Sequence, residues 1–87
     1  MTPNHPTRTK HALERAILEL LEQRAPGKTI CPSEAARLVH PEGWEQHMED
    51  AREAARRLVA KGEIVITQRG RIVDPLSAKG AIRLRRA

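Results

Sequence analysis

One cysteine and two histidines in the middle of the chain have side chains that could support catalysis or bind a metal. Cys31 precedes an expected helix start, where the helix dipole favours a thiolate. A nucleophilic cysteine needs a base, but His40 and His47 do not stand in a recognisable Cys-His-Asn spacing. The same three residues lack the close ligand pair of ordinary zinc sites. We therefore expect no metal site and interpret the histidines as surface or capping residues.

Other catalytic patterns are missing from the sequence. It contains no phosphate-cradling glycine loop, no paired-carboxylate motif and no nucleophile elbow. We therefore predict that the chain is not an enzyme, and that it uses no cofactor and no small-molecule substrate.

Basic side chains in the last third of the chain are stronger candidates for ligand binding. Arg69 and Arg71 flank a glycine that lets the backbone turn tightly and approach a phosphate or a narrow minor groove. An ordinary solvated hairpin tip is the alternative interpretation. A basic segment follows, which would contact phosphates without reading sequence; it comprises Lys79, Arg83, Arg85 and Arg86. Alternatively, Arg83 is held by an acidic partner such as Asp74 and serves the fold.

The charge balance favours a polyanionic partner, although such a surplus is also common on inert surfaces. The 87 residues include 16 Lys and Arg against 11 Asp and Glu, which gives a net charge of +5. Residues 63–87 carry most of the surplus.

Length and composition describe one small globular domain. A chain of 87 residues allows a single core, and 39% hydrophobic with 31% charged residues is typical of a soluble fold. The single cysteine can form no internal disulfide, and the sequence has neither a long apolar run nor an apolar N-terminal stretch. We therefore expect a cytoplasmic protein.

The N-terminal part is expected to be a leader followed by a helix. Residues 1–9 are interpreted as a disordered leader, and residues 10–87 as the folded domain. Within 10–24 the apolar residues recur at helical spacing, which predicts the first helix. Pro26 and the glycine after it end that helix.

Two further helices follow. Pro32 suits the first position of a short second helix, which must end before Pro41. A third helix is expected from Trp44 to about Lys61, with an apolar seam along one face and Gly62 as its left-handed cap. Because Trp44 heads that seam, we interpret it as a core residue rather than a platform for base stacking.

A β-hairpin completes the pattern. β-Branched residues from position 64 to 67 and again at 72 and 73 surround a two-residue turn at Arg69 and its glycine. This turn pairs Gln68 with Arg71 and residue 66 with residue 73. Beyond it, Ile82 and Leu84 alternate with arginines, which predicts a last extended segment.

The order of elements predicts an α+β fold, a three-helix winged helix-turn-helix with a C-terminal β-hairpin wing and a short third strand. Beyond this order of elements, several segments of the sequence are more specific: Ile30 to Arg37, Trp44, Arg57-Leu58, Gly62, Gln68 to Gly70, Val73 to Pro75 and Gly80 to Leu84. Together these resemble a small bacterial winged-helix family that is catalogued only as a domain of unknown function. The similarity covers roughly residues 13–86. It implies the fold and a bacterial cytoplasmic protein, and it supplies no substrate, cofactor or catalytic residue.

The outer face of the third helix argues against reading of bases. A groove-reading helix presents its N-terminal half to the bases, but here that half carries acidic side chains that repel phosphates and that favour the helix dipole. This face becomes basic only at Arg56 and Arg57.

We therefore predict electrostatic binding of duplex nucleic acid, with DNA favoured. The predicted contacts are Arg69, Arg71, Arg57, Lys79, Arg83, Arg85 and Arg86. The alternative is a protein-interaction or scaffold domain, in which Glu49 and Glu53 meet a basic partner.

Overall fold

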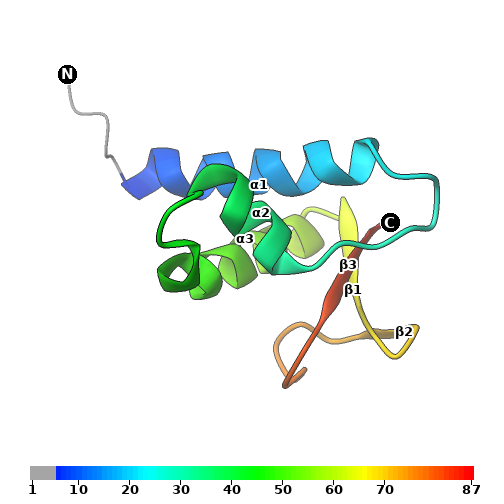
Figure 1. Cartoon of the computed structure of the whole chain (residues 1–87). Helices are drawn as coiled ribbons and strands as arrows, with labels where there is room; N and C mark the ends of the chain where they lie inside the picture. Colours follow the sequence, from blue (N-terminus) through cyan, green and yellow to red (C-terminus); the bar gives the residue numbers. More distant parts are fainter. Residues whose placement is uncertain (1–5) are drawn as a thin grey trace.

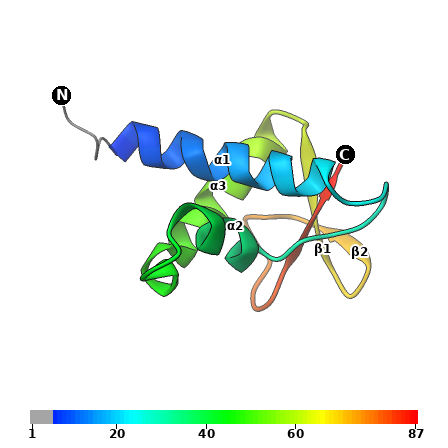
Figure 2. The same ribbon diagram turned by 45° about the horizontal axis from the view of Figure 1, so that its top comes forward.

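The computed structural model describes residues 6–87, in which three α-helices precede a three-stranded antiparallel sheet (Figure 1). The elements are α1 (Pro6–Glu22), α2 (Pro32–Val39), the 3-10 helix η1 (Trp44–His47), α3 (Met48–Ala60), β1 (Ile64–Gln68), β2 (Arg71–Val73) and β3 (Arg83–Arg86). The β1–β2 turn and the loop before β3 both lie at the end of the sheet that is farther from α1 (Figures 1 and 2). No helix within residues 6–87 combines the length and the apolar character needed to cross a membrane.

The first helix begins earlier than its apolar pattern indicates. It starts at Pro6, so positions 6–9 of the expected leader are helical, while residues 1–5 lie outside the described part of the chain. A proline fits the first turn because the backbone N–H that it lacks has no partner there. The helix ends at Glu22, and Gly27 adopts a left-handed conformation in the turn that follows (φ 84°).

The second helix has the predicted start and end. Cys31 is the residue before its first turn, Pro32 occupies that turn, and the Glu34 carboxylate accepts a hydrogen bond of 2.9 Å from the Cys31 backbone N–H. The helix ends at Val39, and residues 40–43 lead to the next helical segment. Gly43 takes a left-handed conformation there (φ 78°).

The expected third helix begins as a 3-10 turn. η1 covers its first four residues, and α3 continues from Met48 to Ala60. Trp44 is half-buried and packs against the core, and the guanidinium of Arg37 lies 4.3 Å from the centroid of its ring. The tryptophan therefore contributes to packing as predicted, but at the edge of the core.

The hairpin has the predicted register. Ile66 pairs with Val73 and Gln68 with Arg71. Both residues of the connecting turn, Arg69 (φ 53°) and Gly70 (φ 80°), are left-handed, as a two-residue turn of the favoured twist requires.

The last strand pairs with the opposite edge of β1, so β1 is the central strand of the order β2-β1-β3. Leu84 of β3 also forms a bridge to Ile30, in the linker before α2. Both residues are fully buried, and they join the sheet to the helices. The largest fully buried side chains are Leu13, Ile17, Ile30, Leu58, Ile64, Ile66 and Leu84.

Candidate functional site

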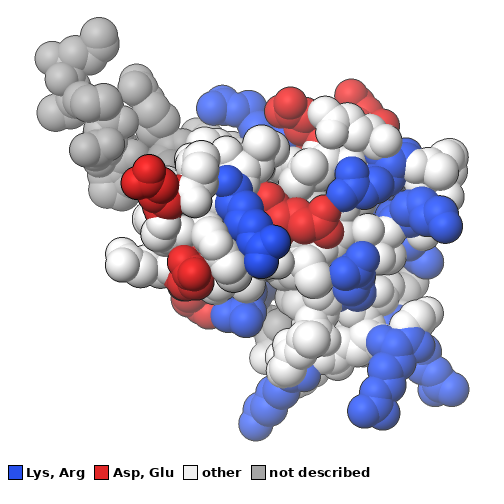
Figure 3. Space-filling view, viewed as in Figure 1, with Lys and Arg blue, Asp and Glu red and all other residues white. Residues whose placement is uncertain are grey.

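Four of the predicted binding residues line one groove between the hairpin and the segment before β3. The groove encloses about 980 Å³, and all the charged side chains that line it, among the described residues, are basic: Arg69, Arg71, Lys79 and Arg83. We call this the basic groove. On the face shown in Figure 3, the charged side chains seen at the end of the molecule formed by the β1–β2 turn and the loop before β3 are all Lys or Arg. No acidic side chain of the described residues lines the basic groove.

The hairpin presents two of these arginines to solvent. Arg69 and Arg71 are both exposed, on either side of the left-handed Gly70. In the described part of the chain, neither side chain nor that of Lys79 forms an ion pair. These three cations are free to meet an anionic ligand.

Gln68 fixes the other wall of the basic groove. Its side-chain amide donates hydrogen bonds to the backbone carbonyls of Lys79, at 2.5 Å, and Ala81, at 3.2 Å. The segment that carries Lys79 is thus tied to β1 by residues that line the groove.

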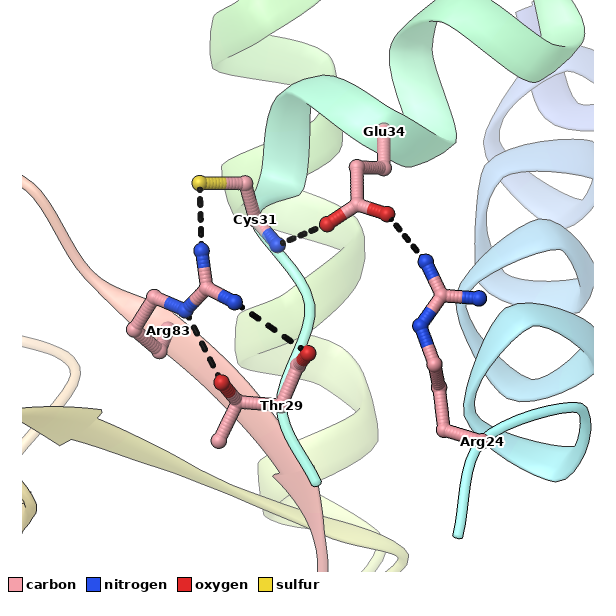
Figure 4. Close-up of polar contacts among 5 residues, drawn as sticks. All are labelled: Arg24, Thr29, Cys31, Glu34 and Arg83. Atoms are coloured by element: carbon pink, nitrogen blue, oxygen red, sulfur yellow. Dashed lines mark hydrogen bonds and ion pairs between the residues drawn. The ribbon is translucent and has the colours of Figure 1, made fainter.

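Arg83 is held by the linker before α2 (Figure 4). Its Nε donates to the Thr29 hydroxyl at 2.9 Å, one terminal nitrogen donates to the Thr29 carbonyl at 3.2 Å, and the other lies 3.2 Å from the Cys31 sulfur. The partner is therefore Thr29 and not Asp74, whose carboxylate accepts a bond from the Leu76 N–H. Arg83 remains exposed, so one side chain both anchors β3 and lines the groove.

Arg57 lies on the face of α3 that contacts α1. Its Nε lies 2.5 Å from one oxygen of Glu14, and Lys61 Nζ lies 3.0 Å from the other. Glu14 is only 7% exposed. Burial raises the pKa of this carboxyl, but the hydrogen bonds and charges of Arg57 and Lys61 outweigh burial and lower the pKa below its ordinary value. Arg57 thus stabilises the packing of α3 on α1.

The last two predicted contacts lie outside the basic groove. Arg85 is half-buried opposite Val65 of β1. Arg86 is exposed opposite Ile64, and its guanidinium lies 3.9 Å from the Glu22 carboxylate at the end of α1. The structure therefore brings together four of the seven predicted basic residues.

The two acidic residues of the alternative hypothesis differ in their surroundings. Glu49 accepts a hydrogen bond of 2.6 Å from Arg56, and Arg52 lies 3.8 Å from its other oxygen. Glu53 is exposed. Part of the acidic face is thus neutralised by arginines of the same helix.

A family model described as a protein of unknown function, DUF3253, matches residues 10–87. The chain belongs to this family. The match confirms the resemblance to a domain of unknown function. Comparison with the curated proteins finds no match.

The cysteine and histidines of the DUF3253 domain lie in two separate contacts. Cys31 contacts Arg83, whereas the rings of His40 and His47 stack with centroids 3.6 Å apart, and His47 also lies 3.2 Å from Asp50. Burial and the neighbouring His47 lower the pKa of His40, against the opposite effect of Asp50. Among the described residues, no group of three or more His, Cys, Asp and Glu side chains has an arrangement that could hold a metal ion.

Sequence reasoning missed two arginines next to the basic groove of this DUF3253 domain. Arg52 and Arg56 line a small depression between α3 and the segment before β3, and Gly80 and Ile82 line both this depression and the groove. The signal was present in the sequence, because Glu49, Arg52 and Arg56 recur at helical spacing on one face.

Proposed function

We propose that this DUF3253 domain is a winged-helix module that binds the backbone of duplex nucleic acid through the basic groove. One observation carries the proposal: the four charged residues of the groove are all basic, and none of them has an acidic partner among the described residues. A negatively charged ligand would supply the missing partners. A phosphodiester backbone presents such charges at regular spacing.

The arrangement of the helices supports the winged-helix interpretation. α2 and α3 are joined through residues 40–43 and η1, and Gly43 provides the left-handed residue that is frequent in the turn of a helix-turn-helix. The β1–β2 hairpin would be the wing. In this interpretation the wing and α3 contact one duplex.

In the binding mode that we propose, the domain contacts the phosphates of the duplex and does not read its bases. Arg69, Arg71 and Lys79 are the principal contacts, because their charges are available, and Arg83 contributes a guanidinium that Thr29 already orients. Arg57 supports α3 through Glu14, and Arg85 and Arg86 extend the positive field beyond the groove.

A role in protein binding through Glu49 and Glu53 has weaker support. The ion pairs of Glu49 with arginines of its own helix reduce the negative charge that a basic partner could meet. Both carboxylates are exposed, but among the described residues only Glu53 of the predicted pair forms no ion pair. The geometry therefore favours nucleic acid.

Fluorescence anisotropy with a labelled random-sequence duplex tests the proposal. Binding should weaken steeply between about 50 and 200 mM salt, with a slope that corresponds to roughly three to six phosphate contacts. The informative variant is Arg69→Asn with Arg71→Gln, because asparagine tolerates the left-handed turn while it removes the charge. This variant should bind about tenfold more weakly or worse, and its salt slope should fall by about 2.

Arg15→Gln with Lys28→Gln is the matched control. Both residues are exposed, neither lines the basic groove, and the pair removes the same charge. The control should retain most of the affinity. Equal losses in the two double variants, or no binding of the unmodified protein at low salt, would contradict the proposal.

A further inference from the structure

The three sides of α3 carry three different sets of side chains. Ala51, Ala54, Ala55 and Leu58 enter the core, and Arg57 with Lys61 meets Glu14 of α1. A third side faces the segment before β3 and carries Arg52 and Arg56. This third side belongs to neither the core nor the α1 interface, so its charges need another explanation.

Arg52 and Arg56 continue the basic groove onto α3. They line a depression of about 150 Å³ together with Gly80 and Ile82, two residues that also line the groove. A second small depression joins Arg52 to Cys31 and Ile82, again residues of the groove wall. An extended polyanion seated in the groove would therefore reach the two arginines of α3.

One carboxylate holds both guanidinium groups. Glu49 bonds to Arg56 at 2.6 Å and lies 3.8 Å from Arg52. The Glu49 side chain is 66% exposed, whereas those of Arg52 and Arg56 are 41% and 32% exposed. A carboxylate and a phosphate present similar pairs of oxygens to a guanidinium, so this carboxylate occupies the arginines as a phosphate would.

We propose that Arg52 and Arg56 form a second line of phosphate contacts, and that Glu49 holds them in the free protein until a phosphate takes its place. The inference rests on the proposed binding of duplex nucleic acid. Exposed ion pairs are weak, so the exchange lowers affinity only a few-fold. Its effect is selectivity, because an anion that fills the basic groove but does not reach α3 leaves the arginines on Glu49.

Three sets of variants in the anisotropy assay test the exchange. Glu49→Gln should raise the affinity about two- to fivefold, because the arginines no longer have to leave a carboxylate. Arg52→Gln with Arg56→Gln should lower the affinity and reduce the salt slope by about 2. The triple variant, which combines all three changes, completes a mutant cycle, and this cycle measures whether the effect of Glu49→Gln depends on the two arginines.

Glu53→Gln is the control for net charge. It lies on α3, is exposed, and changes the charge by the same amount as Glu49→Gln. The exchange is supported if Glu49→Gln raises the affinity more than Glu53→Gln does. This extra gain in affinity must also disappear when Arg52 and Arg56 are both replaced by Gln. A general field effect would instead give equal gains in both single variants, and the gain would persist without the arginines.

The outcome for this inference can be separated from that for the proposed function. If the hairpin variant loses binding while all α3 variants bind like the unmodified protein, the exchange is wrong and the basic groove still binds. If the hairpin variant binds normally, the proposed function is wrong and the exchange fails with it. Thermal unfolding of each variant identifies any loss that comes from unfolding, since exposed pairs contribute little to stability.

Discussion

Two regions of the molecule use arginine in opposite ways. At the α1–α3 interface, Arg57 and Lys61 share the buried carboxylate of Glu14, which lies more than forty positions earlier in the chain. In the basic groove, Arg69 and Arg71 extend into solvent without an ion-pair partner in the described part of the chain. The first arrangement stabilises the fold, and the second leaves charge available for a ligand.

The contrast shows that the surroundings of an arginine decide its role. A cation beside a buried carboxylate repays the desolvation of that carboxylate, so its removal leaves a buried charge without full compensation. A cation on an exposed turn contributes almost nothing to folding. Loss of an arginine should therefore lower stability at the α1–α3 interface, whereas in the basic groove it should weaken ligand binding and leave stability almost unchanged.

The largest expected effect is on stability at the α1–α3 interface. Arg57→Gln should lower the free energy of unfolding by about 1–3 kcal/mol, because Glu14 would keep only the more exposed Lys61 as a partner. Arg71→Gln should change it by less than about 0.5 kcal/mol. Urea titrations of both variants measure the difference, and equal losses would remove the contrast between the regions.

The second effect concerns pH at the same interface. The pKa of Glu14 is lowered in the folded protein, so this carboxylate contributes stability above its ordinary pKa of 4.5. That contribution is lost as the pH falls below 4.5 through the folded-state pKa. Urea midpoints between about pH 6 and 3 should therefore fall less steeply in Glu14→Gln than in the unmodified protein. Parallel curves would show that the carboxylate is not stabilised by its partners.

The smallest expected effect is that of a change at Arg69, which should raise stability and lower the affinity for nucleic acid. Arg69 adopts φ 53°, which is costly for a side chain with a Cβ. Arg69→Asn should raise the free energy of unfolding by up to about 1 kcal/mol while it weakens nucleic-acid binding. Thermal unfolding and anisotropy on the same sample test this combination. If Arg69→Asn is less stable than the unmodified protein, the claim that the left-handed backbone of Arg69 is strained is wrong.

Much of the fold could be predicted from local patterns. The register of the hairpin follows from the two-residue turn at Arg69 and Gly70, because side chains alternate strictly from that point. The ends of α2 follow from Pro32 and Pro41 for a similarly local reason. The start of α1 at Pro6 was missed, since no apolar residue marks its first turn.

The candidate site was less predictable because its partners are distant in sequence. Nothing near Arg57 identifies Glu14, and nothing near Arg83 identifies Thr29. The pairing of β3 with β1 likewise depends on tertiary packing around Leu84. Sequence could therefore find the basic residues of the groove, but it could not separate them from the basic residue that serves the α1–α3 interface.

Backbone amide chemical shifts during titration with a short duplex of random sequence test the central claim most directly. At low salt, the largest changes should fall on residues 69–72 and 79–83, on both walls of the basic groove. Residues 11–22 of α1 should change little, because α1 lies away from the projecting loops (Figure 1). Changes confined to α1, or no changes at any concentration of duplex, would contradict the account.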